Sequence, residues 1–349
     1  MRSKVASFAL SAVLVPSMSV PRIVSEEFIP DLPTLSARSW VLFDADAGVT
    51  LASHNADQSR PMASVTKIMT AIVVMENAAL DESVQVSRRA EAIGESEIGL
   101  VVGESWSVAE LLTATMVRSG NDAAMALAEH VGGSVEEFAG MMNDKAEQLG
   151  LDNTRFKNPH GLDEAGHYAT ANDLAVIAQA ALKHPFLVRL GRTVRVELRP
   201  GPNGESRLAK TTNKLLGAYP GVVGLKTGFT NKAGLVLVSV LERNGRRLIA
   251  VVMKSSNHFK DSRELLEWGA RTPSLKDRFV APLLTLEEEQ GADGGPLDGF
   301  SELEKARLSA VQDIPTGNWV TTSFRTTDLG RNIETWLRSI LPVTLGGAG

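Results

Sequence analysis

Hydrophobic and polar positions follow two different periods along the chain, and the change of period separates strand-like ends from a helical middle. Near both ends, short apolar runs alternate with polar residues or lie between turn residues, which is typical of β-strands. One pair of runs flanks Asn244-Gly245, a dipeptide that favours a tight hairpin. The strands predicted in this way cover residues 39–43, 49–52, 194–198, 222–228, 235–241 and 247–253.

The middle of the chain carries helix start signals. Ser107 precedes an apolar run and is followed three residues later by Glu110, which predicts a capping box, and Ser134 with Glu137 repeats the pattern. Between residues 87 and 102 the pattern weakens around several glycines, which predicts a loop or a short hairpin. The predicted helices cover residues 64–75, 107–117, 123–130, 134–149, 170–183 and 264–270.

Strands at both ends with helices between them predict an α+β fold. We expect one antiparallel sheet, built from N-terminal and C-terminal strands, flanked by helices and packed against a helical lobe. A cleft between sheet and lobe is the natural place for a site. The length of 349 residues accommodates such a domain, assigned to residues 36–275, with a short appendage over residues 276–349.

The N-terminal residues have the composition of a secretory signal. Arg2 and Lys4 precede the apolar run 5–15, which is too short to span a bilayer, and small residues follow up to Ser19. We therefore predict a signal peptide over residues 1–19 and an exported, extracytoplasmic protein. The cleavage site lacks the usual alanines, which leaves an uncleaved tether or a misplaced start codon as alternatives.

The C-terminal appendage begins with a hydrophilic linker over residues 287–296. Beyond it, apolar residues recur at helical spacing, whereas the charged residues between them cancel, so attraction to anionic lipid would be weak. Peripheral membrane association and packing against the protein body are both open for this amphipathic segment. Its apolar positions are Leu329, Ile333, Trp336, Leu337 and Ile340, and its charges are Asp328, Arg331, Glu334 and Arg338.

Composition excludes several classes of function. The net charge is −5 and the chain has no basic stripe, so its charge does not indicate a surface that binds nucleic acid. The chain has no cysteine, hence no disulfide and no thiol nucleophile, and its six histidines form no metal-binding motif. We predict neither a metal nor a cofactor.

The candidate chemistry begins at Ser64-Val65-Thr66-Lys67, directly before the apolar run 68–75. If Ser64 begins that helix, the Lys67 amine lies beside the Ser64 hydroxyl, because residues three apart share a face. Burial among apolar residues would favour the neutral amine, which can take a proton from serine. The same spacing also fits a serine N-cap followed by an ordinary surface lysine.

Two further triplets follow, Ser119-Gly120-Asn121 at a predicted corner between helices and Lys226-Thr227-Gly228 on a predicted strand. In this order the three are the signature of penicillin-binding proteins and class A β-lactamases. The chain resembles the low-molecular-mass penicillin-binding proteins that act as D-alanyl-D-alanine carboxypeptidases, over roughly residues 37–270. The matching runs cover residues 63–70, 119–123, 160–163 and 224–234.

The resemblance implies a β-lactamase/transpeptidase-like fold and a serine peptidase that trims peptidoglycan stem peptides. Ser64 would be the nucleophile that forms an acyl-enzyme, with Lys67 as general base. Ser119 would pass the proton toward the leaving amine, and Asn121 would hold the amide of the substrate. By the same resemblance, β-lactam antibiotics are expected to acylate and inhibit the protein.

The third triplet is expected to bind the terminal carboxylate of the substrate. Lys226 and Thr227 would contact it, with Thr230 as an additional ligand, and Gly228 would let the peptide lie against the strand edge. The backbone N–H groups of Ser64 and Phe229 would form the oxyanion hole. Related enzymes place an arginine after the following hairpin; none aligns here, and Lys254 or Arg263 are possible substitutes.

Three other functions remain open from the sequence. A class A-like β-lactamase shares the nucleophile, but the Glu-x-x-x-Asn segment typical of that class is absent between Asn121 and Lys226. A DD-endopeptidase that cuts peptidoglycan crosslinks would need the same residues. A non-catalytic wall-binding or β-lactam-sensing module would have no need of Lys67.

Overall fold

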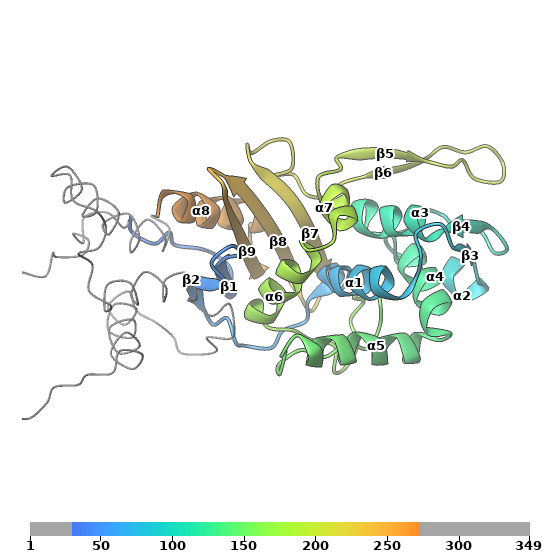
Figure 1. Ribbon diagram of the computed structural model, residues 1–349, viewed down its shortest axis with the longest axis horizontal. Coiled ribbons are helices and arrows are strands. Elements are labelled where there is room, and N and C mark those ends of the chain that lie inside the picture. Colours follow the sequence, from blue (N-terminus) through green and yellow to red (C-terminus); the bar gives the residue numbers. More distant parts are fainter. Residues whose placement is uncertain (1–29, 273–349) are drawn as a thin grey trace, which may run out of the picture. The chain divides into compact units, whose positions relative to one another are not determined.

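The computed structural model describes residues 30–272, which are organised around a five-stranded antiparallel sheet of strand order β2-β1-β9-β8-β7 (Figure 1). The first and last parts of the described chain meet in this sheet, because β1 pairs with β9 and Leu42 lies opposite Ala250. This confirms the prediction of one sheet built from both ends. The strands are β1 (Ser39–Asp44), β2 (Val49–His54), β7 (Val222–Thr230), β8 (Gly234–Arg243) and β9 (Arg246–Ser255).

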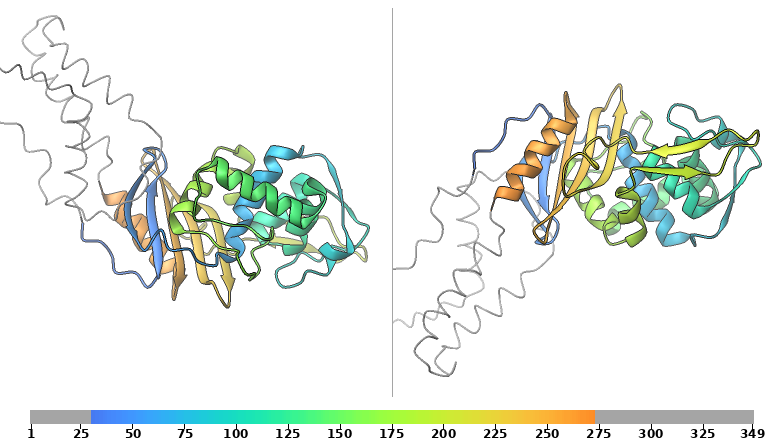
Figure 2. Two further views of the ribbon diagram at one scale, coloured as in Figure 1. Left: turned by 90° about the horizontal axis from the view of Figure 1, so that it is seen from below. Right: turned by 90° about the horizontal axis from the view of Figure 1, so that it is seen from above.

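Helices cover both faces of the sheet. Helix α8 (His258–Arg271) packs on one face, whereas α6 (Ala171–Ala181) and the helical lobe lie on the other (Figure 2). Consequently β8 and β9 are buried in continuous runs of six residues rather than at alternate positions. Helix α8 begins six residues before its predicted start because the Asn257 side chain accepts from the N–H of Lys260 and caps it.

The helical lobe is centred on α1, which is buried over its first eight residues. The capping box predicted at Ser107 is confirmed, since its hydroxyl accepts from Glu110 N–H and the Glu110 carboxylate accepts from Ser107 N–H. At Ser134 only the first of these two bonds forms. The helices of the lobe are α1 (Lys67–Asn77), α2 (Arg88–Glu91), α3 (Val108–Thr113), α4 (Asn121–Gly132), α5 (Val135–Gln148) and α7 (Pro185–Gly191).

Short elements are where the sequence analysis was incomplete. Residues 87–102 contain α2, and the three residues after α6 lead into α7; neither helix was predicted. Strand β5 (Arg195–Leu198) pairs with β6 (Arg207–Lys210), a segment without an alternating apolar pattern of its own. This β5–β6 hairpin extends along the lobe toward the pair β3 (Ser83–Gln85) and β4 (Ser105–Ser107) (Figures 1 and 2).

The predicted signal peptide and the appendage over residues 276–349 lie outside the described residues. Among the helices of residues 30–272, none combines the length and the hydropathy that a bilayer span requires.

Leu42 tests how strongly the core holds the sheet to α8. It is fully buried and lies directly against Gly269 of that helix. We expect Leu42→Ala to lower the free energy of unfolding by about 2–5 kcal/mol, measured by urea denaturation. Leu208→Ala in β6, where the residue is 36% exposed, is the matched control and should change it by less than about 0.5 kcal/mol. Equal effects at the two positions would contradict this assignment of the core.

Candidate active site

Ser64 lies in a single 3₁₀ turn, Ala63–Thr66, that leads into α1. The first residue of α1 is Lys67, and no side chain caps either the turn or the helix. The prediction that Ser64 begins the helix is therefore wrong, because α1 begins one turn later. The alternative that Ser64 is the N-cap of the helix is also wrong. The turn nevertheless keeps the two side chains adjacent, with Lys67 Nζ 3.0 Å from Ser64 Oγ.

Two glycines allow the backbone of other segments to pack directly against this turn. A Cβ at Gly228 of β7 would lie 2.9 Å from both Ala63 Cβ and Ser64 N, and one at Gly161 would lie 2.0 Å from the Ala63 carbonyl oxygen. Gly161 also has φ of +89°, a conformation that favours glycine. Gly228 is thus required for packing β7 against the Ser64 turn, which the sequence analysis did not foresee.

A buried histidine fixes the turn from a third side, and sequence reasoning missed it. His167 Nδ1 accepts from Lys157 N–H, so the neutral ring carries its proton on Nε2 and donates to Thr66 Oγ1 at 2.8 Å. Thr66 Oγ1 in turn donates to the Ala63 carbonyl. Burial lowers the pKa of His167 to about 4, which keeps the ring neutral. No spacing pattern in the sequence links His167 with Thr66.

The Lys67 amine is completely buried and surrounded by oxygen atoms. Besides Ser64 Oγ, Lys67 Nζ contacts Asn121 Oδ1 at 2.7 Å and the His160 carbonyl at 2.6 Å. Those two oxygens only accept hydrogen bonds, so a neutral amine donates both of its protons to them. Its lone pair is then left for the Ser64 hydroxyl, as a general base requires.

Electrostatics favour this neutral form. Burial, followed by the nearby charge of Lys226, holds the pKa of Lys67 well below its ordinary value, against smaller opposing effects of Asp122 and Glu95. The His160 ring adds no positive charge, because burial and the neighbouring Lys67 lower its pKa to about 3. His160 Nδ1 accepts from Leu162 N–H, a hydrogen bond that stabilises the turn over these residues.

The second triplet lies where a π-helical turn, Ala114–Arg118, ends and α4 begins. At this corner Ser119, and not Gly120, takes the left-handed conformation, with φ of 70°. Gly120 is needed for another reason, since a Cβ there would meet Asp122 Oδ1 at 2.9 Å. Asn121 joins the site directly through Lys67, and its Nδ2 donates to the Gly94 carbonyl.

The third triplet brings a second buried amine to the site. Lys226 of β7 is 1% exposed, and its Nζ donates to the Thr227 carbonyl at 3.1 Å. Burial, with a further contribution from Arg118, lowers the pKa of Lys226 to about 7. The hydroxyl of Thr227 hydrogen bonds with that of Thr212. Lys67 thus contacts Ser64 and Asn121 directly, and Lys226 lies near enough for its charge to lower the pKa of Lys67.

The remaining predicted residues lie at the end of β7. Phe229 is 60% exposed, whereas the Thr230 hydroxyl donates to Asp163 Oδ1 at 2.7 Å, so in this structure its proton is used within the protein. The two candidate substitutes for the missing arginine, Lys254 in β9 and Arg263 in α8, are both exposed.

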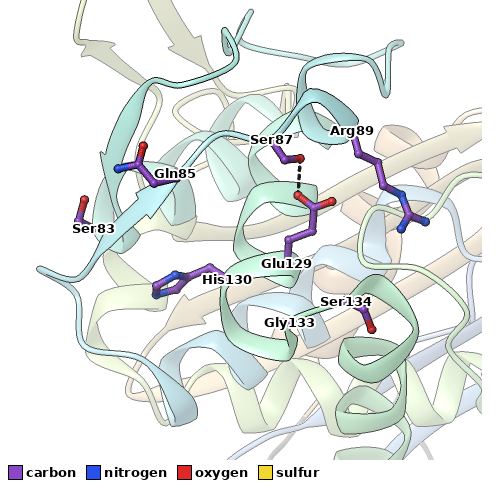
Figure 3. Close-up of a pocket in the computed structure, with 8 residues that line it drawn as sticks. All are labelled: Ser83, Gln85, Ser87, Arg89, Glu129, His130, Gly133 and Ser134. Carbon is purple, nitrogen blue, oxygen red and sulfur yellow. Dashed lines mark hydrogen bonds between the residues drawn. The ribbon is translucent and has the colours of Figure 1, made fainter.

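A polar hollow of about 560 Å³ lies at the opposite end of α4 from Asn121 (Figure 3). A helix of 12 residues places its two ends about 16 Å apart. The hollow is open, and Glu129, which lines it, hydrogen bonds with Ser87. No group of three His, Asp or Glu side chains within residues 30–272 is placed to hold a metal ion.

The sheet, the Ser64 turn and the two buried lysines are the features of a protein that has the β-lactamase/transpeptidase-like fold and a candidate serine nucleophile. A sequence model of the D-alanyl-D-alanine carboxypeptidase family, Peptidase_S11, matches residues 26–257. The crystal structure of the Streptomyces K15 DD-transpeptidase is similar, with a TM-score of 0.66 and 33% identity over 69% of this chain and 99% of that one. This chain belongs to the D-alanyl-D-alanine carboxypeptidase family.

Curated relatives show the same membership. The chain is 40% identical to D-alanyl-D-alanine carboxypeptidase DacF of Bacillus subtilis over 71% of its own length and 61% of that protein. It is 34% identical to DacB2 of Mycobacterium tuberculosis, over 73% of its own length and 86% of the relative. The chain spans less than two thirds of the length of DacF, and of DacC of Escherichia coli it spans 65%.

The packing at Gly228 can be tested by adding one methyl group. Gly228→Ala places a Cβ within 3 Å of the Ser64 turn and must displace Ser64 from Lys67. We expect the rate of Ser64 acylation by a fluorescent penicillin to fall by about tenfold or more. Gly140→Ala in α5, where a Cβ meets nothing within 4 Å, is the matched control and should label at the wild-type rate. Normal labelling of Gly228→Ala would refute the close packing.

The low pKa of Lys226 predicts how stability depends on pH. Between its folded value of about 7 and the ordinary 10.5, the unfolded chain binds a proton that the folded protein does not. The free energy of unfolding therefore rises with pH across this window and loses that contribution as the pH falls toward 7. Lys226→Met should flatten the slope, measured from urea midpoints between pH 7 and 10. The exposed Lys232→Met is the control; if it flattened the slope equally, the assignment to Lys226 would be wrong.

Proposed function

We propose that this protein is a serine-type D-Ala-D-Ala carboxypeptidase that removes the terminal D-alanine from peptidoglycan stem pentapeptides. The observation that carries the proposal is the position of the buried Lys67 amine, within hydrogen-bond distance of Ser64 Oγ and two obligate acceptors. Membership of the D-alanyl-D-alanine carboxypeptidase family supports the same reaction.

In the acylation step, Ser64 Oγ attacks the carbonyl carbon between the two D-alanines while its proton passes to the Lys67 amine. The negative charge that develops on the carbonyl oxygen would be stabilised by the backbone N–H groups of Ser64 and Phe229. As the C–N bond breaks, the proton taken up by Lys67 passes through Ser119 to the leaving D-alanine amine, and Lys67 is neutral again. An ester between Ser64 and the remaining peptide is formed.

The deacylation step uses the same groups with water as the nucleophile. Lys67 accepts a proton from water, which attacks the ester carbonyl, and Ser64 Oγ leaves and regains its proton. The tetrapeptide carboxylate is released and the free hydroxyl is restored. Asn121 fixes Lys67 in both steps through its Oδ1 atom.

The terminal carboxylate of the substrate would bind at Lys226 and Thr227. Lys226 is otherwise a buried cation without a carboxylate hydrogen-bond partner among the described residues, and a bound carboxylate would raise its pKa and hold it protonated. Thr230 would contribute to this site only after its hydroxyl turns away from Asp163. The substrate then aligns along the exposed edge of β7.

The cellular setting belongs to the same proposal. Trimming of peptidoglycan stem peptides takes place outside the cytoplasmic membrane, and the predicted signal peptide over residues 1–19 would deliver the protein there. β-Lactams, which present a strained amide to the serine, would acylate Ser64 and act as inhibitors. Peripheral attachment through residues 329–340 stays a prediction from the sequence.

One assay tests the proposed reaction. The purified protein is incubated with a pentapeptide that ends in D-Ala-D-Ala, and free D-alanine is measured alongside fluorescent penicillin labelling. We expect release of D-alanine by the wild type and loss of both signals, by at least about a thousandfold, in Ser64→Ala. Ser83→Ala, an exposed serine in β3, is the control.

Two further substrates, a chromogenic cephalosporin and a crosslinked peptide dimer, separate the alternatives. Rapid turnover of a chromogenic cephalosporin without release of D-alanine would favour a β-lactamase. Cleavage of a crosslinked dimer with an intact pentapeptide would favour an endopeptidase, and absence of any turnover would favour a non-catalytic module.

A further inference from the structure

The loop over residues 92–103, which follows α2 and ends just before Glu104 and β4, forms one wall beside the Ser119-Gly120-Asn121 corner. Its Ser96 carbonyl accepts from Asn121 N–H at 2.6 Å, and its Gly94 carbonyl accepts from Asn121 Nδ2 at 3.1 Å. The loop therefore orients the amide whose Oδ1 holds Lys67. Contacts that fix this loop therefore also fix the position of Lys67, the proposed general base.

The peptide group between Gly99 and Leu100 is held from both sides by opposite charges. Its N–H donates to Asp122 Oδ2 at 3.1 Å, and the same oxygen accepts from Ile98 N–H at 2.9 Å. Its carbonyl oxygen accepts from Arg207 Nη2. A charge on each side polarises the peptide and strengthens both hydrogen bonds. Asp122 directly follows Asn121, so this chain of contacts reaches the site.

Arg207 is built into the protein rather than exposed on it. Its side chain is 4% exposed, and Nη1 forms a salt bridge of 2.8 Å with Glu104. The guanidinium also stacks on the Trp106 ring, 5.4 Å from its centroid. It comes from β6, in the hairpin that extends along the helical lobe (Figure 2). The proposed reaction assigns no role to the buried guanidinium of Arg207.

We propose that Arg207 is a positioning residue for the reaction at Ser64. Through the Gly99–Leu100 peptide and Asp122 it holds the 92–103 loop against Asn121, and thereby keeps Asn121 Oδ1 on the Lys67 amine. Through Arg207, the β5–β6 hairpin then stabilises the geometry of the active site. This inference rests on the proposed function, in which Lys67 is the general base.

Arg199 provides a control in the same hairpin, although its side chain is 42% exposed and that of Arg207 only 4%. It also stacks on Trp106, 4.6 Å from the ring centroid, and also pairs with a glutamate. Its hydrogen bonds in the described residues, however, go to Glu110 and to the Ser105 carbonyl, beyond the 92–103 loop. A general loss of hairpin packing would affect both arginines, whereas positioning of the loop requires Arg207 alone.

The experiment compares Arg207→Lys with Arg199→Lys in the full chain, each keeping its charge. Three quantities are measured: the rate of acylation by fluorescent penicillin, its dependence on pH, and hydrogen exchange at the amides of Ile98 and Leu100. We expect Arg207→Lys to slow acylation by about 3- to 30-fold. Because a looser loop admits water to Lys67 and favours its ammonium form, the acid limb of the pH profile should move to higher pH.

The same variant should exchange the two amides faster, while Arg199→Lys should match the wild type in all three measurements. Wild-type behaviour of a folded Arg207→Lys, or an equal effect of Arg199→Lys, would overturn the inference. If Arg207→Lys does not fold, Glu104→Gln, which removes the carboxylate that orients the guanidinium, takes its place. A wild type that penicillin does not acylate would overturn the proposed function instead, and amide exchange would still decide whether Arg207 fixes the loop.

Discussion

The constraint on which the site depends is the burial of one amine among oxygen atoms that cannot donate. Lys67 Nζ is removed from water, and two of its three contacts, Asn121 Oδ1 and the His160 carbonyl, are acceptors only. Burial disfavours the charge, and fixed acceptors direct the lone pair of the neutral amine toward Ser64. A surface lysine at the same spacing would be protonated and freely rotating. The proposed role of Ser64 as a nucleophile therefore depends on packing.

That packing brings three distant segments within van der Waals distance of a single turn. Gly228 and Gly161 allow β7 and the loop after Asn158 to approach the Ser64 turn so closely that a methyl group on either would collide with it. The His167–Thr66 hydrogen bond closes the third side. Close contact of backbones leaves the turn little freedom, because the surroundings can relax only by moving whole strands and loops. Precision in the site thus comes from elements that are not themselves reactive.

Two buried lysines are also a source of instability. Both have lowered pKa values, and the folded protein tolerates them because Asp122 lies near Lys67 and main-chain carbonyls accept from both amines. Functional sites commonly store unfavourable electrostatics of this kind, which the rest of the core offsets. Here the buried strands β1, β8 and β9 and helix α1 supply that core. The buried Asp122 carboxylate is linked through the Gly99–Leu100 peptide to the Arg207 guanidinium. This link gives the carboxylate a positively charged partner without placing that cation next to Lys67.

Local patterns in the sequence predicted the strands of the central sheet and most of the helices, and they identified the serine and the lysines of the candidate site. Alternation, capping residues and Asn244-Gly245 are short-range signals that act within a few residues, and three motifs in fixed order are specific when taken together. Tertiary structure alone decided the rest. The bond between His167 and Thr66 and the contact of Arg207 with the Gly99 carbonyl join residues far apart in sequence. Such contacts exist only once packing has placed both partners, so no local pattern along the chain encodes them.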